Sequence, residues 1–383
     1  MPEVMVLGVG MVPFGKHFER TLVNLAAEAA WLALRDADIR PDRIGLGFFA
    51  SATAAPLLRD VTVGQNVFWE VGLNRLPVFN VENACTSGST AFYLAANAVA
   101  AGQAEAVLVV GAEKMLVPSL GLINSGATEL ETQLGLVAPA GFALRARRHM
   151  AEFGTTIEQL ALVSVKNRSH ARLNPLAMLH HKPLSLEEVL AAPLIVDPLT
   201  RFMCCPSADG AAAIVLGSAA QAGNRSRAIP VRAWVYCTGG YENPQDLARW
   251  ETDYRACRTA YEKAGLGPAD LDVIECHDAF AIAELLHYEA LGLCAAGESG
   301  GLAAEGRTTL SGDIPVNVSG GLLSRGHPPG ATGLAQVHEI VTQLRGEAGP
   351  RQVSGARVGL AHCMGGDKAA DAKSCTVLVF TDS

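Results

Sequence analysis

Cysteine and histidine side chains occur at several places where apolar segments give way to short polar turns, and they are the residues best suited to do chemistry. Cys85 lies in "NACTSG", after a short extended stretch and before an Ala-rich helix that we expect over residues 87–101. Free backbone N–H groups and the positive end of the helix dipole favour a thiolate there, and a thiolate attacks carbonyl carbon to form an acyl-enzyme. An isolated cysteine is more often a small buried residue. The polar neighbours Asn83, Thr86 and Ser87 favour the reactive interpretation.

Three further residues stand at comparable places in the C-terminal part of the chain. His277 lies in "ECHDAFA" after an apolar strand, His327 in "SRGHPPGATG" between glycine and proline, and Cys363 in "AHCMGG" after a strand. A single histidine is more often structural, but together these residues permit a division of labour. One cysteine attacks and His327 takes its proton, while the second cysteine exchanges a proton with a carbon acid. Backbone N–H groups near Cys85 and Gly365 can form one oxyanion hole, and the two histidines can polarise a second carbonyl.

The elements that must position these residues occur twice along the chain. "ALRDADIRPDRIGLGFFAS" from Ala33 and "AYEKAGLGPADLDVIECHD" from Ala260 both read as the end of an amphipathic helix, a turn with proline and an apolar strand. Each copy follows a strand, and each leads to an Ala-rich helix, over 87–101 and 331–344, and then to two more strands. Strands that alternate with helices predict parallel sheets. We therefore expect two similar α/β halves packed together.

A segment between the two halves has no counterpart in the repeat, and we expect it to form a loop domain over the active face. The predicted boundaries are 1–115 with 200–222 for the N-terminal half, 116–199 for the loop domain and 223–383 for the C-terminal half. Residues 141–182 carry seven Lys or Arg and two Glu, a net charge of +5 in a chain whose net charge is −8. This segment is either a solvated helical face or a binding site for an anionic ligand such as a phosphorylated cofactor. The candidate ligand-binding residues are Arg145, Arg147, Arg148, His149, Lys166 and Arg168.

Composition narrows the class of protein. The 383 residues are 49% hydrophobic, which is enough for a large core, and the net negative charge argues against nucleic acid as a partner. No apolar stretch is long enough for a membrane span, and "MPEVMVLGVG" predicts a first strand and not a signal peptide. Nine cysteines without a CxxC pair predict reduced thiols in the cytoplasm and no metal site.

Four motifs give the chain a resemblance that covers nearly its whole length. "NACTSG", "HDAFA", "GGLLSRGHPPGATG" and "HCMGG" resemble the thiolase family, in the branch similar to the thiolase domain of sterol carrier protein 2. The resemblance implies a duplicated thiolase fold, five-layered α/β/α/β/α with a loop-domain insert, assembled as a dimer or tetramer. It also implies acyl-CoA and CoA as substrates, with CoA as a co-substrate and no permanently bound cofactor.

The resemblance also implies roles for the site residues by motif position. Cys85 would be the acyl-accepting nucleophile, His327 the base that activates it, and Cys363 the acid and base for the carbon acid. His277 would line an oxyanion hole with His327, and Gly365 would donate with the Cys85 amide. The basic insert would hold the phosphates of CoA. Two departures stand out: His277 replaces the Asn of many thiolases, and Asp367 with Lys368 follows the last glycines.

Three functions are compatible with these residues. The first is an acyl-CoA C-acyltransferase that cleaves a 3-oxoacyl-CoA with CoA, or runs in reverse. The second is a retro-aldol lyase on a hydroxyacyl-CoA, which would not need an acylated Cys85. The third is a non-catalytic subunit that binds acyl-CoA or lipid. Members of this branch sometimes act beside a small zinc-ribbon and OB-fold protein, and such a partner is a further expectation.

Overall fold

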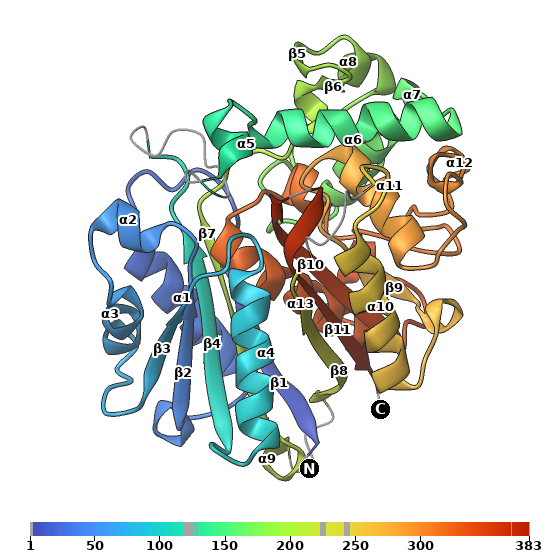
Figure 1. The fold of residues 1–383 in the computed structure, drawn as a ribbon. Helices are drawn as coiled ribbons and strands as arrows, with labels where there is room; N and C mark the ends of the chain where they lie inside the picture. Colours follow the sequence, from blue (N-terminus) through green and yellow to red (C-terminus); the bar gives the residue numbers. More distant parts are fainter. Residues whose placement is uncertain are drawn as a thin grey trace.

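The computed structural model describes residues 3–117, 126, 129–222, 227–240, 246–368 and 370–382, which form two halves of the same design (Figure 1). The N-terminal half contains, in order, β1 (Val4–Met11), α1 (Leu22–Asp36), β2 (Leu46–Ala50), β3 (Val78–Val81), α4 (Ser87–Ala100), β4 (Ala106–Glu113) and β7 (Gly210–Ser218). The C-terminal half contains β8 (Ile229–Cys237), α10 (Glu251–Ala264), β9 (Val273–Glu275), α13 (Pro329–Leu344), β10 (Val358–Lys368) and β11 (Asp371–Thr381). Except for β3, each element of the first half has its counterpart in the second, which confirms the predicted duplication.

The strands form one sheet in the order β3-β2-β4-β7-β1-β8-β11-β10-β9. The two halves join where Met5 and Val6 of β1 pair with β8. The prediction of parallel sheets is only partly right: β2 is parallel to β3 and β4, and β10 to β9, but β7 and β11 run antiparallel to both neighbours. The reason is the last strand of each half, which reverses direction. β11 does so through a tight turn in which Ala370 has a φ of 63°.

Three hydrophobic clusters account for the layered arrangement. One packs α1 against the N-terminal strands, one packs α10 against the C-terminal strands, and the third surrounds α4 and α13 between the two halves. A helix layer therefore lies on each outer face and another in the middle, as the five-layered fold requires.

Glycines allow the central helices to approach each other very closely. A Cβ atom added at Gly111 in β4 would lie 2.1 Å from the Gly330 carbonyl oxygen in α13, and one added at Gly88 would lie 2.5 Å from it. Any side chain at these positions would force the two halves apart. The start of α13 is thereby held against the start of α4, which brings distant parts of the chain to one place.

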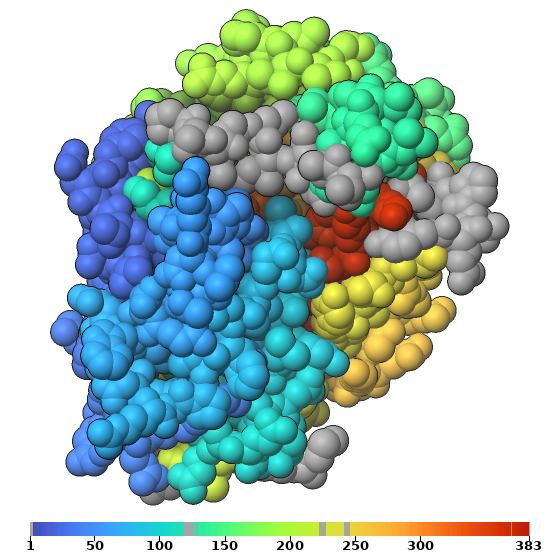
Figure 2. Space-filling view, turned by 60° about the vertical axis from the view of Figure 1, so that its left-hand side comes forward, coloured from blue at the N-terminus to red at the C-terminus, as the bar shows by residue number. Residues whose placement is uncertain are grey.

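The segment between β4 and β7 lies across one end of the molecule (Figure 1). In the space-filling view, its green residues lie above the region where the blue N-terminal half meets the red C-terminal strands (Figure 2). Its elements are α5 (Leu130–Gln133), α6 (Ala138–Phe153), α7 (Ile157–Ala171), α8 (Leu186–Leu190), β5 (Leu194–Val196) and β6 (Leu199–Thr200). The boundaries 116–199 stay a prediction, and residues 118–125 and 127–128 at its start lie outside the described part of the chain.

Shorter helices complete the two halves. They are α2 (Ala54–Leu58), α3 (Val63–Glu70) and α9 (Ala219–Ala222) in the first, and α11 (Ala281–Ala290) and α12 (Ser299–Ala304) in the second. Among the described residues, no helix combines the length and the apolar character that crossing a membrane demands.

Candidate active site

Cys85 and His327 meet at the seam between the two halves. The Cys85 Sγ lies 3.3 Å from the His327 Nε2. On the other side of the ring, the His327 Nδ1 lies 2.7 Å from the Thr332 hydroxyl, which donates its own hydrogen to the Pro328 carbonyl at 2.9 Å. Because the hydroxyl has only one hydrogen, the Nδ1 of His327 must be the donor in this contact. The Nε2 is then unprotonated and faces the Cys85 thiol, as a general base should.

A second thiol–imidazole pair adjoins the first. The Cys363 Sγ lies 3.4 Å from the His277 Nδ1 and 3.2 Å from the Cys85 carbonyl oxygen. The His277 and His327 rings meet edge to face, with centroids 5.1 Å apart. The structure therefore brings together all four residues that the sequence singled out. It differs in one detail, because β10 continues to Lys368 and Cys363 lies within this strand instead of after it.

The charge state of the Cys85–His327 pair corrects one prediction. Burial, with a smaller effect of the Glu113 carboxylate, raises the pKa of Cys85 from 9.0 to about 12. Burial and the nearby Arg325 lower the pKa of His327 to about 3. A helix terminus contributes about 0.3–1 kcal/mol, less than the roughly 1.4 kcal/mol of one pKa unit, so burial decides the outcome. The expected standing thiolate is wrong: both groups are neutral near pH 7, and a thiolate forms only as the proton passes to His327.

Backbone amides also line the site. A Cβ atom at Gly365 would lie 2.9 Å from the Thr86 nitrogen, so this stretch of β10 packs directly on the start of α4. The backbone N–H of Gly366 is hydrogen-bonded to the Cys85 thiol and opposes the rise of its pKa. The sequence pointed to Gly365, whose role stays a prediction, and it missed Gly366. The positive φ of 69° at Gly366 was not visible in the sequence.

Glu113 is a second residue that the sequence analysis missed. Its buried carboxylate accepts hydrogen bonds from the Ser51 hydroxyl at 2.6 Å, from the Thr53 hydroxyl and backbone N–H, and from the Gly330 N–H at 2.8 Å. It thereby ties the end of β4 to the first turn of α13, directly after His327. A charged residue at the end of the apolar strand "AVLVVGAE" was the available signal.

Four of the six residues proposed to bind phosphate are buried in internal contacts. Arg145 pairs with Asp367 at 2.9 Å and stacks on Trp250, with 4.2 Å from its guanidinium carbon to the ring centroid. His149 contacts Thr155 and Glu289, Lys166 contacts Glu284 and Tyr288, and Arg168 donates to Ser324 at 3.0 Å. A buried cation is tolerated only beside such partners, which leaves it unavailable to a ligand.

The other two basic residues are exposed but already paired. Arg147 forms an ion pair with Asp197, and Arg148 forms ion pairs with Glu152 at 2.7 Å and with Asp246 at 3.3 Å. The six residues therefore do not form an open positive surface, and a role for them in binding the phosphates of CoA stays a prediction.

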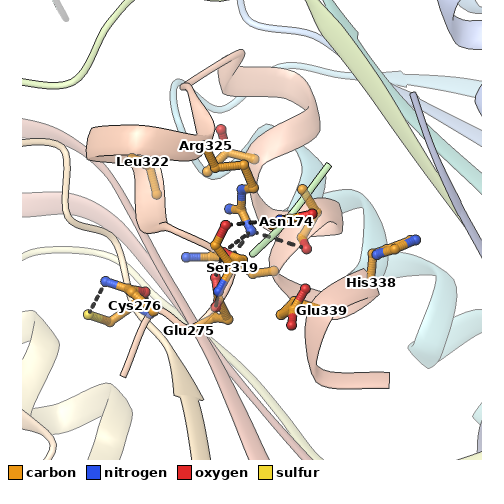
Figure 3. A network of polar contacts seen from close by, with 12 residues as sticks. Asn174, Glu275, Cys276, Ser319, Leu322, Arg325, His338 and Glu339 are labelled. Atoms are coloured by element: carbon orange, nitrogen blue, oxygen red, sulfur yellow. Dashed lines mark hydrogen bonds and ion pairs between the residues drawn. The ribbon is translucent and has the colours of Figure 1, made fainter. Parts of the chain in front are cut away.

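A buried polar network surrounds Arg325, which precedes the catalytic candidate His327 by two residues in the sequence (Figure 3). The Arg325 Nη1 donates to Glu275 at 3.1 Å and to the Ser319 hydroxyl at 2.9 Å, and Asn174 donates to the Ser319 carbonyl at 2.9 Å. A single π-helical turn begins at Gly321 and ends at Arg325. A fixed cation at this place disfavours a second positive charge and helps to keep His327 neutral.

Comparison with known proteins agrees with this geometry. Residues 4–220 match the family description "Thiolase, N-terminal domain", and residues 241–379 match "Thiolase C-terminal domain-like". Sterol carrier protein 2 of Oryctolagus cuniculus is 40% identical over 95% of this chain and 70% of its own length. Acetyl-CoA acetyltransferase of Methanothermobacter thermautotrophicus is 38% identical over 96% of this chain and 97% of its own. Benzoylsuccinyl-CoA thiolase subunit BbsB of Thauera aromatica is 37% identical over 95% of both.

Solved structures show the same fold. An Ltp2-ChsH2(DUF35) aldolase has a TM-score of 0.84 at 26% identity and covers 99% of this chain and 98% of that one. Acetyl-CoA acetyltransferase from Syntrophomonas wolfei has a TM-score of 0.75 at 20% identity, over the full length of both chains. Given relatives of this similarity over nearly its whole length, the chain belongs to the thiolase family, in the branch of sterol carrier protein 2, and is an enzyme of the acyltransferase class.

Proposed function

We propose that the protein is an acyl-CoA C-acyltransferase that cleaves a 3-oxoacyl-CoA with CoA through an acyl-Cys85 intermediate, or runs this reaction in reverse. The observation that carries the proposal is the Cys85–His327 contact at 3.3 Å, with the unprotonated Nε2 of His327 facing the thiol. CoA acts as a co-substrate and not as a resident cofactor.

In the first step, the Cys85 sulfur attacks the C3 carbonyl while its proton moves to His327. The bond between C2 and C3 then breaks, which leaves the acyl group on Cys85 and the electron pair on C2 of the shorter acyl-CoA. Cys363 protonates this carbon, consistent with the burial that keeps its pKa raised and its thiol protonated. The His277 and His327 side chains support the enolate oxygen, and backbone N–H groups at Cys85, Gly365 and Gly366 support the tetrahedral oxyanion.

In the second step, the Cys363 thiolate takes the proton of the incoming CoA thiol, and the CoA sulfur attacks acyl-Cys85. The expelled Cys85 sulfur recovers its proton from His327. Every group begins and ends in the neutral state that its buried surroundings favour, so the cycle needs no other acid or base.

A retro-aldol lyase is the second candidate, because a solved structure named as an aldolase has a TM-score of 0.84 with this chain. Such an enzyme would remove the proton of a 3-hydroxyl group and would leave Cys85 unacylated. A subunit that only binds acyl-CoA or lipid would use neither thiol–imidazole pair. The two functions therefore differ from the first in whether Cys85 becomes covalently modified.

The test is intact mass spectrometry after mixing with acyl-CoA, combined with product analysis on paired 3-oxoacyl-CoA and 3-hydroxyacyl-CoA substrates. We expect an acyl adduct on the wild type and on Cys237→Ser, none on Cys85→Ser, and cleavage of the 3-oxo substrate only when CoA is present. Cleavage of the 3-hydroxy substrate without an adduct would favour the lyase. The absence of both reactions would favour a binding subunit.

A second copy of the chain is the partner that the surface supports. β3 is an edge strand of the sheet, with Phe79 51% exposed and Trp69 of the neighbouring α3 71% exposed. An edge strand of this kind pairs readily with its own copy, which gives the expected homodimer, or a tetramer built from it. Light scattering on the purified protein tests this, with Phe79→Lys expected to give monomers.

A different subunit is a separate proposal. The relative from Thauera aromatica is named as a subunit, and the aldolase structure is named together with a DUF35 protein. A small zinc-ribbon and OB-fold partner would fit this pattern, and co-purification from the native host tests it. Full activity of the chain alone on its native substrate would remove the reason to propose it. The cytoplasmic location inferred from the cysteines likewise stays a prediction.

A further inference from the structure

Next to the two thiol–imidazole pairs, one buried carboxylate contacts two histidines, one through each oxygen, and we call this arrangement the fork. Asp253 in α10 contacts the His287 Nδ1 through one oxygen at 2.6 Å and the His362 Nε2 through the other at 2.9 Å. All three side chains are fully buried. Of the three, only His362 belongs to a motif that suggested the active site, "HCMGG", and none takes part in the steps proposed above.

Each histidine is linked to one member of the Cys363–His277 pair, whose side chains lie 3.4 Å apart. The His287 Nε2 lies 3.1 Å from the His277 carbonyl oxygen, so α11 reaches back and holds the loop that carries His277. His362 is the residue before Cys363 in β10. Asp253 is therefore the common anchor of the loop that presents His277 and of the strand that presents Cys363.

The hydrogen positions follow from the partners. His287 lies between a carboxylate and a carbonyl, which both only accept, so both contacts are hydrogen bonds when each ring nitrogen carries a hydrogen. Burial lowers the pKa of His287, and the Asp253 carboxylate opposes this shift. Among the described residues, none is a hydrogen-bond partner of the His362 Nδ1, so this ring donates to Asp253 through Nε2. With His287 charged, it forms an ion pair with Asp253, an arrangement that burial tolerates.

A metal ion is the other occupant that these donors suggest, because ligand atoms of Asp253, His362 and Cys375 lie within 4.8 Å of one another. The hydrogen bonds around these side chains argue against it. A histidine that binds a metal almost always donates its other N–H to a partner, whereas the Nδ1 of His362 has no partner among the described residues. The imidazoles of His287 and His362 already occupy both oxygens of Asp253.

We infer that Asp253 is a positioning residue for the carbon-acid half of the reaction: it fixes the His277 loop and the Cys363 strand relative to each other through His287 and His362. The inference rests on the proposed function. Cys85 and His327 have separate anchors in Thr332 and Glu113, so attack by the Cys85 sulfur on a reagent whose leaving group takes no proton does not depend on this fork. Asp253 thus acts on the proton transfers of Cys363 and spares the Cys85–His327 pair.

The experiment compares two rates in the full-length protein, alkylation of Cys85 by iodoacetamide, in which iodide leaves without a proton, and cleavage of a 3-oxoacyl-CoA by CoA. In Asp253→Asn, only the amide oxygen can accept a hydrogen bond, so one of the two histidines loses its acceptor and the fork is broken. We expect cleavage to fall at least tenfold while alkylation of Cys85 stays within twofold of wild type. Glu251→Gln, a change at a partly exposed residue of the same helix, is the matched control and should alter neither rate. His287→Gln keeps a donor toward the His277 carbonyl and should show a smaller loss of cleavage, even if Asp253→Asn does not fold.

The outcomes separate the two proposals. Absence of acylation in the wild type would contradict the proposed function itself. If the wild type forms the acyl adduct, equal losses of cleavage and of Cys85 alkylation in Asp253→Asn and His287→Gln, or no loss of either rate, would overturn the positioning role. Stoichiometric zinc in the purified wild type that is lost in Asp253→Asn would replace the hydrogen-bonded fork with a metal site.

Discussion

The two thiol–imidazole pairs have nearly the same contact distance and very different surroundings. Cys85 with His327 is 3.3 Å apart, and Cys363 with His277 is 3.4 Å apart. In the first pair, Thr332 fixes the ring so that an unprotonated nitrogen faces the sulfur. In the second, the His277 backbone is held from behind, and the Cys363 thiol can donate either to the ring or to the Cys85 carbonyl. In the proposed reaction, the same two side-chain types therefore act as a nucleophile with its base in one pair and as a proton donor in the other.

Loss of the first sulfur should have the largest effect. Cys85→Ser should lower both acylation and cleavage at least about 10³-fold, because a hydroxyl in this buried site is much harder to deprotonate than a thiol. Rates of single-turnover cleavage measure this, with Cys237→Ser as the control. Turnover of Cys85→Ser close to that of the wild type would contradict the assignment of Cys85 as the nucleophile.

Loss of the second sulfur should separate the half-reactions. Cys363→Ala should lower cleavage of a 3-oxoacyl-CoA by about 10²–10⁴, the usual contribution of a general acid, and leave an acyl adduct on Cys85 detectable by mass. If cleavage persists and the adduct is lost, the roles of the two cysteines are reversed.

Thr332→Val tests why the first pair is a base. Valine keeps the shape but removes the acceptor of the His327 Nδ1–H, so the ring is free to move its hydrogen to the side that faces Cys85. Acylation should fall by about 10- to 100-fold, by analogy with a metal-binding histidine that loses the hydrogen-bond partner of its other ring nitrogen. Thr342→Val, on the same helix, is the control. An unchanged acylation rate would mean that Thr332 does not set the tautomer.

The first pair should also shape the dependence of stability on pH. Burial lowers the pKa of His327 from 6.5 to about 3. Between these pH values the unfolded chain binds a proton at this residue and the folded protein does not. Stability is therefore lost as the pH falls from 6.5 toward 3. Burial raises the pKa of Cys85 from 9.0 to about 12, so stability is lost as the pH rises from 9 toward 12. Melting temperatures should form a plateau between these limits.

Variants can show which residues cause the loss of stability at acid pH (the acid limb) and at alkaline pH (the alkaline limb). His170 and His338, whose pKa burial lowers to about 4, contribute to the acid limb, so His327→Asn should make it shallower without abolishing it. Cys85→Ser should do the same for the alkaline limb. Limbs that do not change in these variants would mean that neither group titrates as its burial requires.

The smallest effect is expected from the exposed arginines of the insert. Arg147→Gln combined with Arg148→Gln should change the KM for CoA less than twofold, because both side chains are already paired and surface ion pairs are worth about 0–1 kcal/mol. Initial rates at several CoA and salt concentrations measure this. A rise in KM of fivefold or more that fades at high salt would restore the phosphate-binding role predicted from the sequence.

The sequence was sufficient for the features that repeat or that lie at strand ends. The match between the segments from Ala33 and Ala260 predicted the duplicated halves, and the placement of Cys85 and His327 beside Ala-rich helices predicted their meeting. It was not sufficient for the charge state of Cys85, because a local helix end is visible in a sequence and burial by distant elements is not.

The same limit explains the basic segment and Glu113. Arg145 is paired with Asp367, which lies 222 residues further along the chain, so the local charge count could not show that this arginine already has an acidic partner. Glu113 looked like the end of a strand, and only the fold shows that its partner Gly330 is 217 residues away.

The glycine contact between the central helices joins equivalent places of the two halves. Cys85 stands two residues before Ser87, the first residue of α4, and His327 stands two residues before Pro329, the first residue of α13. The sulfur and the ring that touch therefore occupy the same place in the two copies of the repeat. Two cysteines at this place would offer two thiols and no imidazole base. The different residue types at one repeated position thus give the contact a donor and an acceptor.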